Sequence, residues 1–203
     1  MAKKPRVPGE VFLNIPYDKK FERLFVAYIA GITAFGLMPR ATLEIRSSSR
    51  RLEKILRLIA DCRFSIHDLS RVELDVRPPR TPRFNMPFEL GLAVGSYWKA
   101  MGKQNWFVCE AKGYRLSKSL SDLNGTDPYI HDGKIAGVFR ELCNIFTRSG
   151  GQPTVQQMNL IYRELRRNLP AILRRSGSLS LYTTTVFKEL AVAAKICAEN
   201  IML

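Results

Sequence analysis

The sequence predicts an α/β fold in which short parallel strands alternate with helices. Residues 1–147 alternate β-rich runs with segments whose apolar residues recur every three or four positions. The chain has 203 residues and is 46% hydrophobic, which is enough to bury a core. Its apolar runs are interrupted before they reach the roughly 18 to 20 residues that a membrane span needs. We therefore expect a globular protein with no membrane partner.

The first part of this region contains three predicted strands. Each of the first two leads into a helix, and Ser47 to Ser49 can cap the second helix. In chain order the segments are the strand "EVFLNIP" (10–16), the helix "KKFERLFVAYIAGITAFG" (19–36) closed by Gly36, the strand "MPRATLE" (38–44), the helix "RRLEKILRLIADC" (50–62) and the strand "RFSIHDL" (63–69).

The second part begins with a loop from Ser70 to Arg83, which contains three prolines and has no periodicity. The segments that follow are the helix "FNMPFELGLAVG" (84–95), the strand "NWFVCEA" (105–111), a turn-rich crossover with a short strand near 128–131, and the helix "KIAGVFRELCNIF" (134–146). After a Gly-containing break the pattern is purely helical, with Pro170 as a kink or boundary. We therefore expect two units, an α/β domain over 1–147 and a helical appendage over 148–203.

This alternation favours a doubly wound, flavodoxin-like sheet with strand order 2-1-3-4-5. In such sheets the ligand crevice lies beyond the carboxyl ends of the strands, where the strand order reverses. For this order the reversal lies between the first and third strands. The crevice should therefore receive Asn14, Tyr17 and Asp18 from the first loop, and Asp68, Ser70, Arg71 and Glu73 from the loop after the third strand.

Composition restricts the chemistry of this crevice. The four cysteines lie far apart and only two histidines are present, so we expect reduced core cysteines and no metal site. The formal net charge of +14 is spread along the chain rather than gathered in one arm, which leaves a nucleic-acid partner open without favouring one. The basic start lacks an apolar run before Glu10, so we expect a cytoplasmic protein.

No glycine-rich dinucleotide motif, P-loop or nucleophile elbow is found in the sequence. The crevice residues are carboxylates, an amide, a tyrosine and an arginine. Carboxylate and amide groups can bind ribose hydroxyls, and a carboxylate can stabilise an oxocarbenium-like transition state. The residue types therefore favour the handling of a sugar.

Three segments, "VFLNIPYDKKFERLF", "RFSIHDLSRVE" and "FNMPFELGLAVG", together resemble bacterial TIR-like (Toll/interleukin-1 receptor-like) nucleotide-binding proteins and the structurally related nucleoside 2-deoxyribosyltransferases. The resemblance covers residues 10–140. It implies that Glu89 is the catalytic carboxylate acting at C1′ of a ribosyl group, with Asn85 at the start of its helix beside the substrate. It also implies an N-glycosidic-bond hydrolase that takes NAD as substrate rather than as cofactor, as an effector in bacterial antiphage immunity.

Several of these residues also have a purely structural interpretation. Glu89 could complete a capping box as the third helical residue if Pro87 is the first, although the cap would then be Met86, which has no side-chain oxygen. If Asn85 is the cap, Glu89 is the fourth helical residue and loses this role. Asp18 could cap the first helix, and Asp68 could form a strand-end turn. Arg71 could bind phosphate or pair with Glu73.

Outside the site, we interpret His67 as a satisfied core histidine. Gly91 and Gly95 are interpreted as close packing of their helix on the sheet, or on a ligand. We expect the C-terminal helices to contact a protein partner or a second copy of the chain. The alternative to an enzyme is a non-catalytic nucleotide-sensing or assembly module of the same fold.

Overall fold

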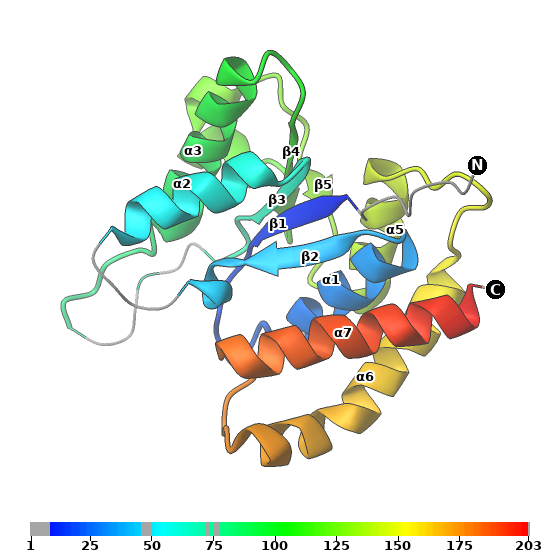
Figure 1. The fold of residues 1–203 in the computed structure, drawn as a ribbon. Coiled ribbons are helices and arrows are strands. Elements are labelled where there is room, and N and C mark those ends of the chain that lie inside the picture. The colour runs from blue at the N-terminus through cyan, green and yellow to red at the C-terminus, as the bar shows by residue number, and fades with distance from the viewer. Residues whose placement is uncertain (1–8, 46–49, 72–73, 75–77, 203) are drawn as a thin grey trace.

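A five-stranded parallel sheet forms the centre of the molecule (Figure 1). The computed structural model describes residues 9–45, 50–71, 74 and 78–202. The strand order is β2-β1-β3-β4-β5, which confirms the predicted flavodoxin-like sheet. The strands are β1 (Glu10–Asn14), β2 (Met38–Ala41), β3 (Phe64–Asp68), β4 (Asn105–Glu110) and β5 (Tyr129–Ile130).

Helices cover both faces of the sheet because alternate residues of each strand point to opposite sides. Phe12 packs against α2 (Arg51–Asp61) and α3 (Asn85–Lys99) on one face. Its neighbours Val11 and Leu13 belong to the larger cluster on the other face, with α1 (Glu22–Ala34) and α5 (Ile135–Ile145). Figure 1 shows α2 and α3 together, away from α1 and α5.

The C-terminal helices α6 (Val155–Ser176) and α7 (Thr184–Ile201) form a further layer over α1. Their apolar residues, Leu165 and Phe187 among them, lie in the same buried cluster as Phe25 of α1. The predicted boundary at residue 147 falls in the connection between α5 and α6. The helices beyond that connection nevertheless share the hydrophobic core of the α/β part.

Close contact between these helix layers depends on Gly31, in the middle of α1. A Cβ atom at this position would run into the side chain of Leu142 in α5 and would also meet Met158 of α6. A larger residue would therefore hold α1 away from its neighbours.

The predicted end of α1 is also confirmed, since Gly36 follows the helix with a positive φ of 72°.

Some local predictions differ from the structure. Helix α6 runs through Pro170 without ending there, so the predicted boundary at this proline is wrong. The turn-rich crossover contains a short helix, α4 (Arg115–Ser119), and the 3-10 turn η2 (Ser121–Leu123), neither of which the sequence pattern predicted. The predicted cap at Ser47 to Ser49 lies outside the described residues. Among the described helices, none combines the length and apolarity needed to cross a bilayer.

Candidate functional site

The carboxyl ends of β1 and β3 lie side by side, and the loops that follow them meet. Asn14 and His67 are register partners at this edge. Beyond them, Arg71 Nε donates to Asp18 Oδ2 over 3.0 Å, so an ion pair joins the two loops. The predicted juxtaposition of the first-strand and third-strand loops is confirmed. Of the two predicted roles for Arg71, pairing is observed with Asp18, and Glu73 lies outside the described residues.

Glu89 lies in α3, which borders this edge. The helix begins at Asn85 with Phe84 as its N-cap residue, and no side chain caps it. Glu89 is therefore the fifth helical residue. The backbone N–H groups that a carboxylate could accept from belong to the first turn, and Glu89 lies beyond that turn. The predicted capping-box role for Glu89 is wrong, because the helix begins two residues before Pro87, and its cap is Phe84 rather than Asn85.

The surroundings of Glu89 are unusual for a carboxylate. Its exposed fraction is 9%, and among the described residues no side chain or backbone group donates a hydrogen bond to it. Burial raises its pKa from the ordinary 4.5 to about 7, and the positive charge of Arg51 opposes this rise in part. A carboxylate that is desolvated but unpaired is costly to keep in a fold. The cost is typical of a group retained for chemistry.

Asn14 fixes the position of this helix against the sheet. Its side-chain amide donates to the Met86 carbonyl over 2.8 Å and to His67 Nδ1 over 2.9 Å. Met86 is one turn before Glu89, so the end of β1 holds the turn that carries the carboxylate. The Oδ1 atom of Asn14 accepts no hydrogen bond from the described residues, which leaves it able to accept one from a ligand.

His67 completes this arrangement without contributing chemistry of its own. Since Nδ1 accepts from Asn14, the ring proton lies on Nε2, which donates to Ser65 Oγ over 3.0 Å. Burial lowers the pKa of His67 to about 3, so the ring is neutral. The prediction of a satisfied core histidine is confirmed.

Tyr17 and Asp18 lie in the loop that follows β1. The Tyr17 hydroxyl lies 3.2 Å from Thr42 Oγ1, and burial, with Glu89 as a further negative neighbour, raises its pKa. The contribution of Glu89 to this rise means that its carboxylate lies in the neighbourhood of Tyr17. Asp18 Oδ1 accepts from the backbone N–H of Phe21 in the turn before α1. The N-cap residue of α1 is Phe21 and no side chain caps the helix, so the predicted capping role of Asp18 is wrong.

The connection between α6 and α7 holds this loop in place. The Tyr182 hydroxyl donates to the Asp18 carbonyl over 2.6 Å, and its ring packs against the Tyr17 ring at a tilt of 40°, with centroids 5.4 Å apart. Thr184 donates to the Leu43 carbonyl over 2.5 Å. The C-terminal helices therefore fix the first loop of the crevice, a contact that the sequence pattern did not indicate.

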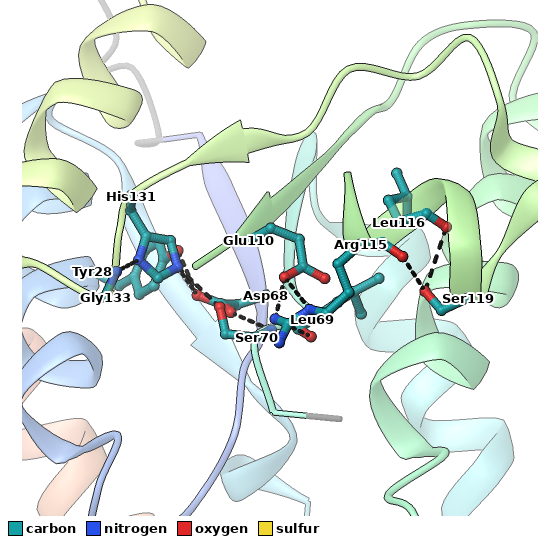
Figure 2. Close-up of polar contacts among 10 residues, drawn as sticks. All are labelled: Tyr28, Asp68, Leu69, Ser70, Glu110, Arg115, Leu116, Ser119, His131 and Gly133. Carbon is teal, nitrogen blue, oxygen red and sulfur yellow. Dashed lines mark hydrogen bonds and ion pairs between the residues drawn. The ribbon is translucent and has the colours of Figure 1, made fainter. Parts of the chain in front are cut away.

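Asp68 lies at the centre of a fully buried polar cluster (Figure 2). Its Oδ2 accepts from the Tyr28 hydroxyl over 2.8 Å and from His131 Nε2 over 3.0 Å, while its Oδ1 accepts from the backbone N–H of Ser70. Both carboxylate oxygens are thus engaged within the protein. The predicted turn-forming role of Asp68 is observed in its bond to Ser70.

This cluster contains a serine, a histidine and an aspartate, but it is not a nucleophilic triad. His131 Nδ1 accepts from the Gly133 N–H over 3.0 Å, so the ring proton lies on Nε2. Ser70 Oγ is 3.1 Å from that same Nε2, which is also the atom bonded to Asp68. A general base needs a free lone pair facing the serine, with the carboxylate on the other ring nitrogen. Ser70 is therefore not activated as a nucleophile.

A second buried carboxylate, Glu110, ends β4 next to this cluster. Arg115 of α4 forms an ion pair with it and also donates to the Leu69 carbonyl over 3.3 Å (Figure 2). Burial raises the pKa of Glu110, and Arg115 opposes the rise. Its Oε1 is closed off from solvent and has no hydrogen-bond partner in the described part of the chain, whereas the oxygens of Glu89 are not closed off in this way. The sequence did not indicate that Glu110, Arg115, Tyr28 and His131 belong to this buried polar cluster. Glu110 and His131 lie at the ends of strands, and this position was the one sequence signal for their place beside Asp68.

The predicted site residues thus differ in what they can offer to a ligand. Within the part of the chain that the structure describes, the oxygens of Glu89 and the Oδ1 atom of Asn14 have no hydrogen-bond partner, and the Tyr17 hydroxyl has only Thr42. Asp18, Asp68, Ser70 and Arg71 are engaged with one another or with the scaffold, and Asn85 is exposed at the start of α3. Comparisons with protein-family models, with curated proteins and with solved structures find no match.

Proposed function

We propose that this chain is a TIR-like N-glycosidic-bond hydrolase that acts on NAD or a related nucleotide, with Glu89 as its catalytic carboxylate. The observation that carries the proposal is the state of Glu89. It is buried at the switch point of a flavodoxin-like sheet and receives no hydrogen bond from the described residues. The resemblance of three ordered segments to the TIR-like proteins supports the same residue.

An unpaired carboxylate suits cleavage of a ribosyl bond. The bond breaks as the leaving base departs with its electron pair, and positive charge develops at C1′ and the ring oxygen. A carboxylate within a poorly solvated site stabilises that charge more strongly than it would in water. Water then adds to C1′, and the products are the free base and a ribosyl hydroxyl.

The raised pKa of Glu89 agrees with a positively charged substrate. At about 7, a large fraction of the group is protonated at neutral pH. The nicotinamide ring of NAD carries a positive charge, so its binding favours the ionised carboxylate and lowers this pKa. The free enzyme should therefore gain kcat/KM as pH rises through about 7, because only the ionised form acts.

Other crevice residues would hold the substrate. Asn14 Oδ1 is available to accept from a ribose hydroxyl, and Tyr17 has Glu89 as a charged neighbour. Asp18, Asp68, Ser70 and Arg71 would act through the backbone of the two loops, because their side chains already bond within the protein. By the same resemblance, we propose that NAD depletion during bacterial antiphage defence is the biological effect.

The test is nicotinamide release from NAD by the purified full chain. Wild type should release nicotinamide with a rate that rises between pH 6 and pH 8, and Glu89→Gln should lose at least about a hundredfold. Glu53→Gln is the matched control, because it removes an exposed carboxylate from α2, next to α3, and should leave the rate unchanged. If Glu89→Gln cleaves as fast as wild type, the assignment of this residue is wrong.

Thermal stabilisation by a ligand, measured together with nicotinamide release, distinguishes a nucleotide-sensing module of the same fold from a hydrolase. ADP-ribose should raise the melting temperature of the wild-type protein in either case, because it fills the crevice. Stabilisation without nicotinamide release over many hours would support the sensor and overturn the hydrolase. Neither stabilisation nor release would overturn both.

A further inference from the structure

One face of α3 is exposed and apolar along its whole length. Phe84 is 66% exposed, Phe88 is 54% exposed and Trp98 is 75% exposed. Gly91 and Gly95 lie between them and are also exposed. These five positions follow a spacing of four, three, four and three residues, so at 3.6 residues per turn they occupy an arc of about 80°. Glu89 is on the opposite side of the helix.

No part of the described chain packs on this face. A Cβ atom added at Gly91 or at Gly95 would meet nothing within 4 Å. The predicted packing of these glycines on the sheet is therefore wrong. Each glycine costs a helix interior about 1 kcal/mol relative to alanine, and no contact in the described structure offsets that cost. A bare backbone groove flanked by aromatic side chains allows another helix to approach closely.

The exposed apolar area equals that of the largest apolar patch on a typical monomer, and such a patch is often functional. At about 200 Å² for a fully exposed aromatic side chain, the three aromatic residues present about 400 Å². Monomeric proteins rarely leave a contiguous apolar patch larger than a few hundred Å². The same area is roughly half of the ~800 Å² that each partner contributes to a standard interface. Leu52 and Leu56 of the adjacent α2 are also exposed.

The order of residues on this face identifies its partner. Gly91 and Gly95 are equidistant from position 93, and so are Phe88 and Trp98. A two-fold symmetric interface requires that residue i meets residue j and that j meets i. We propose that α3 pairs antiparallel with α3 of a second copy of this chain. Gly91 then meets Gly95 of the second copy, and Phe88 meets its Trp98.

The positive charge of each chain determines how the affinity of this dimer depends on salt. Arg83 and Lys99 flank the face, and each chain carries a formal net charge of +14. Repulsion between two such chains is screened by salt, whereas apolar contact is not weakened by it. The dimer should therefore tighten as salt increases. Two chains bridged by a polyanion would instead separate, because salt weakens phosphate contacts.

Sedimentation velocity of the full chain, freed of nucleic acid, tests the pairing over a range of protein and salt concentrations. We expect a reversible dimer that tightens with salt and that Trp98→Ser and Gly95→Leu each weaken at least about tenfold. Gly95→Leu introduces a good helix former into open space, so its loss of dimer cannot be attributed to unfolding. Leu179→Ser, which removes a fully exposed leucine outside α3, is the matched control and should leave the dimer intact. A monomer at every concentration, a dimer that salt dissociates, or a dimer unaffected by both variants would overturn the proposal.

Cross-linking tests the antiparallel register. Cys143 and Cys197, the two half-buried cysteines, are first changed to alanine. Phe88→Cys and Trp98→Cys proteins are then mixed and treated with a short bis-maleimide. The mixture should give the 88-to-98 heterodimer in excess over the homodimers that each protein forms alone. Preferred 88-to-88 and 98-to-98 products would mean a parallel contact and would contradict the proposed symmetry.

Discussion

Replacing Glu89 with glutamine should make the protein more stable at neutral and alkaline pH. The folded protein raises the pKa of Glu89 from 4.5 to about 7, so the folded state holds this proton more tightly than the unfolded state does. The stability that the protonated group contributes is fully present below pH 4.5 and is lost as pH rises through 7. Above pH 7 the ionised group costs the folded state about 3 kcal/mol, because each pKa unit corresponds to about 1.4 kcal/mol. Glutamine has a similar shape and cannot ionise, so it avoids this cost.

Urea unfolding at several pH values measures the effect. The difference in unfolding free energy between Glu89→Gln and wild type should approach about 3 kcal/mol at pH 8.5 and fall below about 1 kcal/mol near pH 5. Glu53→Gln should show a small and nearly pH-independent difference, because Glu53 is exposed and paired with Arg57. An equal m-value in wild type and variant is required for the comparison.

A pH-independent difference, or a variant less stable than wild type at pH 8.5, would refute the reasoning. Either result would mean that the carboxylate is solvated or paired in solution. The expected result would instead mean that Glu89 is kept at a cost in stability, which is typical of functional groups. That result would hold whether or not NAD is the substrate.

The remaining predictions concern the scaffold around the site. Gly91→Ala should stabilise the monomer by about 0.5–1 kcal/mol, because it removes a helix penalty without meeting any atom; thermal melting at low protein concentration checks this. Gly137→Ala should instead destabilise it by several kcal/mol, because the new Cβ would run into the backbone carbonyl of His131; an unchanged melting temperature would contradict the observed packing. Tyr182→Phe removes the hydrogen bond to the Asp18 carbonyl and should cost about 1 kcal/mol, with a larger loss of ligand binding than of stability. Equal losses in both measurements would show that Tyr182 does not position the first loop.

The fold could be predicted because periodicity reports which faces of the elements are buried. The strands are short, nearly continuous apolar runs, and apolar residues recur every three or four positions in α1 and α5. This pattern alone predicted the order of elements. The meeting of Asp18 and Arg71 followed from topology, since the carboxyl ends of adjacent parallel strands lie at one edge.

The partners of the polar groups could not be predicted in the same way. Asp68 looked like a ligand-facing residue, yet Tyr28 and His131, 40 and 63 positions away, engage it fully. Hydrogen bonds of this kind depend on distances that no local pattern encodes. The glycines of α3 were misinterpreted for the same reason, because a glycine in a helix signals a close approach without saying by what.

The bond between Tyr182 and the Asp18 carbonyl joins residues 164 positions apart, which bears on when the site is completed. A chain grows from its N-terminus at about 5–20 residues per second, so about 8–30 seconds separate the synthesis of these two residues. During that interval the first loop of the crevice lacks the contact that holds it. The site is therefore finished only when almost the whole chain has been made. A truncated product that ends before Tyr182 would contain every predicted site residue and still lack this contact.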